Sequence, residues 1–142
     1  MKVQQYMTKD VKTCRENDSV THAVEMMVEY NIGSIIIIKD KKPFGIFSER
    51  DLVKRVVALG KDPDKVLLGN VMTQDPISID AEDSVGHAYH IFVKNNIRHA
   101  PVVKSGKLVG IVSQRDLAKV IDERFYVTYF GKYGKRDLSG EY

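Results

Sequence analysis

Cysteine is almost absent from this chain of 142 residues, since Cys14 is the only one. An internal disulfide is therefore impossible, and the paired cysteines typical of structural zinc sites are missing. Long apolar runs are absent too, because a stretch such as 35–38 is far shorter than the ~20 residues that cross a bilayer. No secretory signal is recognisable in the first ten residues, MKVQQYMTKD. These features predict a protein of the reducing cytoplasm that does not enter a membrane.

A strong charge of either sign is also missing. Lysine and arginine number 22 against 19 acidic residues, and a net charge of +3 is too weak to indicate nucleic-acid binding by itself. A hydrophobic content of 43% is ordinary for a soluble globular protein. The serines and histidines show no context of a nucleophile with its base, such as Gly-x-Ser-x-Gly. We therefore predict no catalytic residues and do not expect an enzyme.

What the chain does contain is one unit written twice. A shift of 65 residues aligns 7–54 with 72–119 without a gap, and 20 of these 48 pairs are identical. The identities include a nine-residue phrase that reads IFSERDLVK at 46–54 and IVSQRDLAK at 111–119. Similarity of this extent does not arise by chance, so the halves are predicted to be duplicated copies of one structural unit.

Each copy predicts a strand, a helix, two further strands and a final helix. Asp-Ser pairs at 18–19 and 83–84 are typical of helix N-caps, and apolar residues follow at helical spacing. The apolar runs at 35–39 and 100–104 do not alternate, which is typical of strands buried on both faces. The first copy predicts strands at 11–14, 35–39 and 44–48 with helices at 20–30 and 49–59; the second predicts strands at 77–79, 100–104 and 108–113 with a last helix at 114–123.

A unit of about 50 residues cannot bury enough apolar surface to fold alone. We therefore expect an α/β protein of the α+β type, in which two β-α-β-β-α repeats pack sheet to sheet about a pseudo-two-fold axis. The predicted division is a first repeat at 1–60, a connector at 61–69, a second repeat at 70–123, and an aromatic and basic tail at 124–142.

The repeated Ser-x-Arg-Asp phrase has two interpretations. In the first, Ser48 and Ser113 cap the helices that follow them, and Asp51 or Asp116 completes a capping box three residues later. In the second, the helix N-terminus binds an anionic ligand, its Asp accepts hydrogen bonds from both hydroxyls of a ribose, and Arg50 pairs with phosphate. Capping does not require an arginine in both copies, which favours the binding role.

These landmarks, which read MT…DSVxxA…I…K…GIxSxRDL twice, closely resemble a tandem pair of CBS domains, named after cystathionine β-synthase. The resemblance covers residues 3 to about 123. It implies a regulatory module that binds an adenine nucleotide (AMP, ADP or ATP) or S-adenosylmethionine, modulates an unknown protein partner and performs no chemistry. It also implies that two modules pair into a disc-like homodimer.

The resemblance further implies two clefts, in each of which the Ser-x-x-Asp of one copy holds the ribose of a ligand whose base lies on the other. The first cleft is expected to contain Ser48, Arg50, Asp51, Ile77, Ser78, Ala88, Ile97, Arg98, His99, Ala100 and Pro101. The second is expected to contain Thr13, Cys14, Ala23, Ile32, Gly33, Ser34, Ile35, Ser113, Arg115 and Asp116. Because the basic pair Arg98–His99 has no counterpart at Gly33–Ser34, we expect the first cleft to prefer phosphorylated ligands. The second is expected to be weaker, empty, or suited to a less charged adenosine compound.

Two further signals indicate less. His87 and His90 lie one helical turn apart, but no third or fourth ligand is evident, so no metal site is predicted. The predicted tail gathers the aromatic residues Phe125, Tyr126, Tyr129, Phe130 and Tyr133. Such a cluster favours docking on the protein or on a second subunit. Nucleic-acid binding through this tail and a ligand-free dimerisation scaffold are the alternative functions.

Overall fold

The computed structural model describes residues 1–130, with side chains described as far as Asp122. Residues 131–142 and the side chains beyond Asp122 lie outside this description, and so does the aromatic cluster of the predicted tail. Within the described residues, no helix is both long and apolar enough to cross a bilayer.

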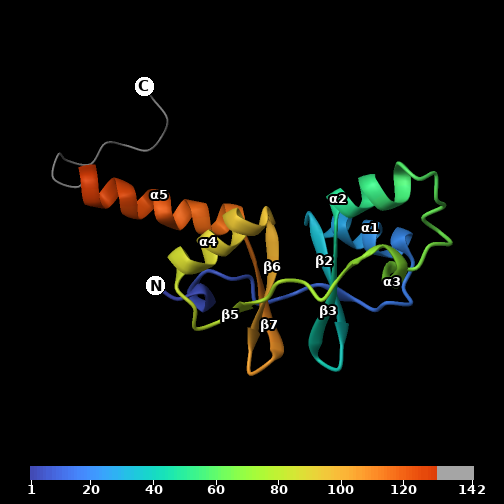
Figure 1. Cartoon of the computed structure of the whole chain (residues 1–142), viewed down its shortest axis with the longest axis horizontal. Helices are drawn as coiled ribbons and strands as arrows, with labels where there is room; N and C mark the ends of the chain where they lie inside the picture. Colours follow the sequence, from blue (N-terminus) through green and yellow to red (C-terminus); the bar gives the residue numbers. More distant parts are fainter. Residues whose placement is uncertain (131–142) are drawn as a thin grey trace.

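The first unit is built on a four-stranded sheet. Its elements are β1 (Thr13–Cys14), α1 (Val20–Glu29), β2 (Ser34–Lys39), β3 (Lys42–Ser48) and α2 (Glu49–Asp51), followed directly by a π-helical segment, η2 (Leu52–Val57). The strand order is β1-β2-β3-β4, where β4 (Thr73–Gln74) comes from the second copy. β1 pairs with β2 in parallel, and β3 pairs antiparallel with both of its neighbours. Figure 1 shows α1 and α2 together on one side of this sheet.

The second unit repeats the arrangement with three strands. Its elements are β5 (Ile79–Asp80), α4 (Val85–Asn95), β6 (His99–Lys104), β7 (Lys107–Ser113) and α5 (Gln114–Phe130). The sheet order is β5-β6-β7, again with one parallel and one antiparallel pair. The predicted fold class is therefore confirmed. The last helix was predicted to end at residue 123, but it continues to Phe130, because no proline or glycine interrupts residues 114–130.

The segment that precedes each unit packs against the other one. Residues 1–8 include a short 3₁₀ turn, η1 (Val3–Gln5), and the fully buried Val3 lies in the core of the second unit. Thr8 bridges to Ile111 of β7 through two backbone hydrogen bonds of 2.8 and 3.0 Å. Conversely, α3 (Leu68–Val71) and β4 complete the first unit. The predicted ranges of the two repeats therefore interleave in space, and β3 and β7 lie side by side at the centre (Figure 1).

Each unit has its own apolar core under its helices. Phe47 and Ile35 are fully buried in the first, and Phe92 and Val102 occupy the second. Full burial of such a side chain stabilises the fold by about 1.5–3 kcal/mol. The helices turn their apolar faces inward because the pattern repeats every three to four residues.

Two glycines allow the crossing segments to approach the central strands. A Cβ at Gly45 would overlap the sulfur of Met72, and one at Gly110 would overlap the sulfur of Met7. The Gly110 position is the tighter one, since its Cβ would also lie 3.0 Å from the backbone oxygen of Thr8. That oxygen is fixed by its hydrogen bond from Ile111, whereas a methionine side chain can adjust its rotamer.

We therefore expect Gly110→Ala to lower the free energy of unfolding by about 1–3 kcal/mol, the usual cost of overpacking. Gly45→Ala should cost less, because only the flexible Met72 side chain must move. Urea denaturation followed by circular dichroism measures both values. Equal costs for the two substitutions would contradict the assigned role of the Thr8 carbonyl.

Candidate functional site

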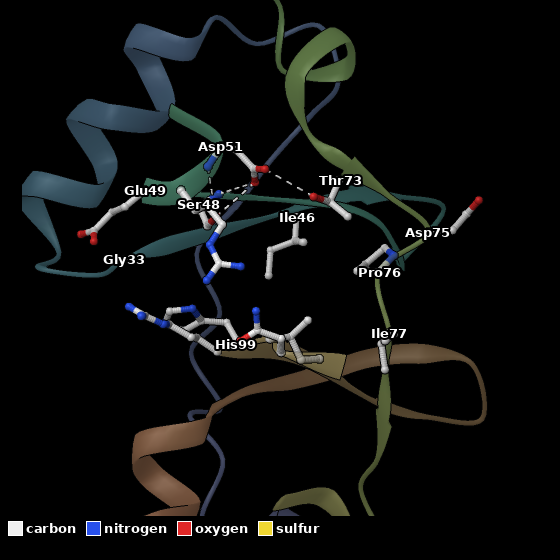
Figure 2. A pocket seen from close by; sticks show the side chains of 14 residues that line it. Gly33, Ile46, Ser48, Glu49, Asp51, Thr73, Asp75, Pro76, Ile77 and His99 are labelled. Carbon is white, nitrogen blue, oxygen red and sulfur yellow. Dashed lines mark hydrogen bonds between the residues drawn. The ribbon is translucent and has the colours of Figure 1, made fainter. Parts of the chain in front are cut away.

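A cavity of about 280 Å³ lies between the two units; it is called the central cavity below. Figure 2 shows the first unit forming its upper side and the second unit forming its lower side. Its lining residues are Gly33, Ile46, Ser48, Glu49, Arg50, Asp51, Thr73, Asp75, Pro76, Ile77, Asn96, Ile97, Arg98 and His99. Residues far apart in the sequence therefore surround a single space.

Asp51 caps its helix and borders the cavity at the same time. Its Oδ2 accepts hydrogen bonds from the backbone N–H of Ser48 at 3.0 Å and from its hydroxyl at 3.2 Å. In return, the Asp51 N–H donates to the Ser48 Oγ, at 3.4 Å. In the second copy, the Ser113 N–H donates to the Asp116 Oδ2 at 3.2 Å, and the Asp116 N–H donates to the Ser113 Oγ at 3.0 Å. The capping interpretation is thus observed in both copies, and it does not exclude a ligand because Asp51 also lines the cavity.

The other carboxylate oxygen of Asp51 is less occupied. Asp51 is only 7% exposed, and the Thr73 hydroxyl donates to its Oδ1 over a long 3.4 Å. The Arg55 Nε lies 3.7 Å from the same oxygen. Arg55 also donates to the Met72 carbonyl at 2.7 Å, which holds the crossing segment onto the first unit. The Oδ1 atom can accept a further hydrogen bond from a molecule in the cavity.

Apolar side chains form the walls of the cavity. Ile46 points into it from β3, and Ile77 borders it from the segment before β5 (Figure 2). Ile97 faces this space because Asn96, with φ of 51°, ends α4 in the left-handed conformation and turns the chain toward β6. Ile77 is 40% exposed, an unusual state for a large apolar side chain beside a cavity. These walls suit a flat apolar group such as a purine ring.

Basic side chains also line the central cavity. Arg50 lies at the start of α2, while Arg98 and His99 lie at the start of β6. A second opening of about 420 Å³, called the side pocket below, shares Arg98 and His99 with the central cavity. Its remaining lining residues are Ser113, Gln114, Arg115 and Ala118. Arginines therefore line both spaces, and a guanidinium group is suited to binding an anionic group.

The pKa of His99 lies below the ordinary value for histidine. Burial is the main cause, because it disfavours the charged imidazolium, and the nearby Arg98 acts in the same direction. The Glu49 and Asp116 carboxylates oppose this shift. In the absence of an anion, His99 is therefore neutral at neutral pH.

The structure gathers most residues predicted for the first cleft. Those that line the central cavity are Ser48, Arg50, Asp51, Ile77, Ile97, Arg98 and His99. Ser78 lies just beyond and is half-buried, while Ala88, Ala100 and Pro101 are buried behind the lining. Ala88 and Ala100 belong to the core of the second unit.

Residues predicted for the second cleft are more dispersed. Gly33 lines the central cavity, and Ser113 and Arg115 line the side pocket. Cys14, Ala23, Ser34 and Ile35 are buried, whereas Thr13, Ile32 and Asp116 are half-buried. Lys12 occupies the position equivalent to Ile77, where it binds Asp10 at 3.0 Å and lies 4.4 Å from the centre of the Tyr30 ring. A charged side chain thus replaces an apolar wall.

The sequence interpretation missed several residues that line the central cavity. They are Ile46, Glu49, Thr73, Asp75, Pro76 and Asn96. Four of them, Ile46, Thr73, Asp75 and Asn96, are identical in the two copies. Identity between the two copies could therefore have indicated that these four positions are functionally important. Thr73 reaches Asp51 only because β4 pairs with β3, a crossing that spacing along the chain does not reveal.

Comparison with known proteins identifies the repeated unit. The CBS domain family model matches residues 3–58 and again residues 68–123. An uncharacterised protein of Methanopyrus kandleri, MK0525, is 38% identical over 79% of this chain, which spans 58% of that relative's length.

Solved structures agree with the fold. A protein with CBS domains from Burkholderia ambifaria covers 98% of this chain and is itself covered completely, with a TM-score of 0.83 at 23% identity. The CBS domain pair of protein MJ0100, in complex with 5′-methylthioadenosine and S-adenosylmethionine, covers 87% of this chain and 98% of its own, with a TM-score of 0.78 and 25% identity. A hexameric CBS-CP12 protein from bloom-forming cyanobacteria covers 97% of this chain and 78% of its own, with a TM-score of 0.76 and 28% identity.

The lowered pKa of His99 leads to a prediction about stability. A histidine whose pKa is lower in the folded state binds fewer protons there than in the unfolded chain. The contribution of neutral His99 to the free energy of unfolding is therefore complete above pH ~6.5. It is lost as the pH falls through the folded-state pKa. We expect the parent to lose more free energy of unfolding than His99→Gln between about pH 7.5 and 5. Denaturant titrations across this range measure both, and parallel profiles would contradict the assignment.

Proposed function

This chain belongs to the CBS domain family as a pair of domains, and we propose that the pair binds a phosphorylated adenosine compound in the central cavity and thereby regulates a protein partner. The observation that carries the proposal is one space bordered by three kinds of group. Apolar walls lie at Ile77 and Ile97, a buried carboxylate lies at Asp51, and cations lie at Arg50 and Arg98. This combination matches the base, the ribose and the phosphate of a nucleotide.

The adenine ring would lie between the isoleucines of the two units. Ile46 enters from the first unit, while Ile77 and Ile97 belong to the second. Covering an exposed side chain such as Ile77 removes apolar surface from water, which contributes about 25 cal/mol per Å². Because both units contact the same ring, the ligand would stabilise one arrangement of the pair over others.

The ribose would bind at Asp51. Its Oδ2 is held by the cap, so the Oδ1 atom is the one that would accept a hydrogen bond from a ribose hydroxyl. The Thr73 hydroxyl, 3.4 Å from Oδ1, would shift toward the ligand or donate alongside it. A hydrogen bond to a carboxylate contributes about 1.5–3 kcal/mol.

The phosphates would bind the arginines. Arg98 lines both openings, so a phosphate in the central cavity and the next one in the side pocket could contact the same guanidinium. Arg115 also lines the side pocket. The carboxylates of Glu49 and Asp75 point away from the middle of the cavity (Figure 2), so they would not repel a phosphate bound there.

The adenosyl ligands of the MJ0100 pair support this choice of base and sugar. The arginines, however, favour an anion such as AMP, ADP or ATP over the sulfonium cation of S-adenosylmethionine. We further propose that the pair acts as a homodimer. The hexameric CBS-CP12 relative supports self-association of such pairs, although its assembly is larger. Ligand binding between the units would then change the surface offered to a partner.

Calorimetry with AMP, ADP, ATP, adenosine and S-adenosylmethionine tests the proposal. Asp51→Ala should weaken nucleotide binding by about 1–3 kcal/mol, because it removes the ribose acceptor. Asp116→Ala is the matched control, since it removes the same cap from the second copy and does not line the central cavity. Equal losses in the two variants would assign the effect to capping and would contradict the ribose site.

Arg98→Ala separates the phosphate contact from the base contact. It should reduce the affinity for AMP or ATP by about 1–3 kcal/mol, while the affinity for adenosine changes little. The same calorimetric titrations measure this difference. A parallel loss for adenosine and AMP would contradict phosphate binding at Arg98, and no heat with any adenosine compound would contradict the proposed function as a whole.

A further inference from the structure

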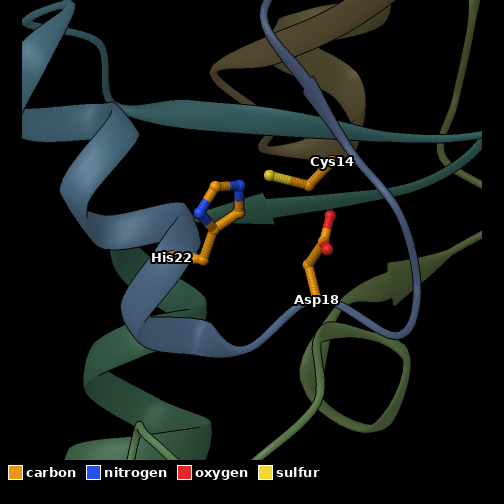
Figure 3. Close-up of side chains that lie close together, drawn as sticks. All are labelled: Cys14, Asp18 and His22. Carbon is orange, nitrogen blue, oxygen red and sulfur yellow. The ribbon is translucent and has the colours of Figure 1, made fainter.

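A second group of chemically active side chains lies away from the central cavity, at the start of α1. Cys14 ends β1, Asp18 lies in the turn that follows, and His22 lies in the first turn of the helix. Their ligand atoms, one from each residue, all lie within 4.8 Å of one another. Figure 3 shows the Cys14 sulfur and the His22 ring pointing toward each other, with the Asp18 carboxylate beside them.

The backbone of each of these residues is held in place. Cys14 pairs with Ile37 in the sheet, and the Asp18 carbonyl accepts a hydrogen bond of 2.9 Å from the N–H of Leu68. The Asp18 Oδ2 also accepts one of 2.7 Å from the N–H of Arg15. The N–H of His22 donates to the capping hydroxyl at 3.1 Å. The fold therefore sets the backbone positions of the three residues before any ion arrives, and the His22 ring still has to turn toward the other two donors.

The donor set indicates which ion would bind. A thiolate, an imidazole and a carboxylate together are typical zinc ligands, whereas calcium and magnesium prefer oxygen alone. Metal–ligand bonds of ordinary length place the donors of a zinc site roughly 3.3–3.6 Å apart. His22 is exposed, so its ring can rotate inward. This rotation would shorten the distances between the donors, which now reach up to 4.8 Å, to those of a zinc site.

We propose that Cys14, Asp18 and His22 form a Zn²⁺ site with three protein ligands and a fourth position open to solvent. The side chains run from buried through half-buried to exposed, so an ion can enter from the His22 side. Zinc would displace the proton of the Cys14 thiol to water and bind the thiolate.

The second copy provides a natural comparison. At the equivalent positions it carries Ile79, Asp83 and His87, and the two Asp83 oxygens lie 2.8 Å from the His87 Nδ1. The acid and the imidazole are thus retained, but the sulfur donor is replaced by an apolar side chain in the core. Only the first copy therefore has a complete set of three donors among the described residues.

The sequence interpretation did not predict this site. The sequence offered no paired cysteines and no third ligand for His87 and His90, and Cys14 was assigned to the second cleft. Cys14, Asp18 and His22 follow one another at intervals of four residues, but they do not lie on one helix. A strand supplies the first, a turn the second and a helix the third. The structure brings them together at the point where the chain reverses.

The test uses the full chain without an affinity tag, titrated with Zn²⁺ by calorimetry and with Co²⁺ as an optical probe. We expect one tightly bound ion per chain, with a near-ultraviolet band from cobalt–thiolate charge transfer. Cys14→Ser should abolish this band, and His22→Ala should weaken Zn²⁺ binding roughly tenfold or more. His87→Ala is the matched control and should leave both unchanged.

Several outcomes would overturn the proposal. One is the absence of the cobalt–thiolate band in the parent, and another is Zn²⁺ binding that persists unchanged in both Cys14→Ser and His22→Ala. A loss in His87→Ala that equals the loss in His22→Ala would assign the ion to surface histidines. Because His22 is exposed, its substitution does not disturb the core, so the test holds even if Cys14→Ser folds poorly. None of these readouts depends on nucleotide binding.

Discussion

The close approach of each crossing segment to a central strand is the constraint on which the rest of this structure depends. Met72 packs over Gly45, and Met7 packs over Gly110, because neither strand carries a side chain at that point. The first of these contacts lets β4 pair with β3 and brings Thr73 beside Asp51. Without it the central cavity would lose one wall, since the segment after β4 supplies the neighbouring lining.

The helix cap beside the central cavity shows how one arrangement can serve two roles. The Ser–Asp box satisfies backbone groups at the start of a helix in both copies, so folding alone accounts for its presence. Asp51 also borders a cavity with apolar walls, the central cavity. At the equivalent place in the other copy, Lys12 stands where Ile77 would be and pairs with Asp10. The two caps are therefore alike, and the side chains that face them differ between the copies.

The same logic separates the two copies at the start of their first helices. Both place an aspartate and a histidine four residues apart, and both begin the helix with a serine cap. In one copy the preceding strand ends in Cys14, and in the other Ile79 fills the core. The two copies have the same backbone arrangement here, and the difference between Ile79 and Cys14 places a sulfur donor where the other copy has an apolar core residue. The two copies therefore share one backbone fold and differ in the side chains available to bind a ligand or an ion.

The sequence by itself determined the duplicated unit, the order of its strands and helices, and the Ser–Asp caps, because these depend on local patterns and on identities 65 residues apart. It also pointed to eight of the residues that line the central cavity, seven of them predicted for the first cleft. Only the tertiary structure decided that Thr73 reaches Asp51, that Arg98 and His99 serve two openings, and that Cys14 meets His22. These contacts join segments that cross between units or reverse direction, and their geometry depends on packing that no local pattern encodes.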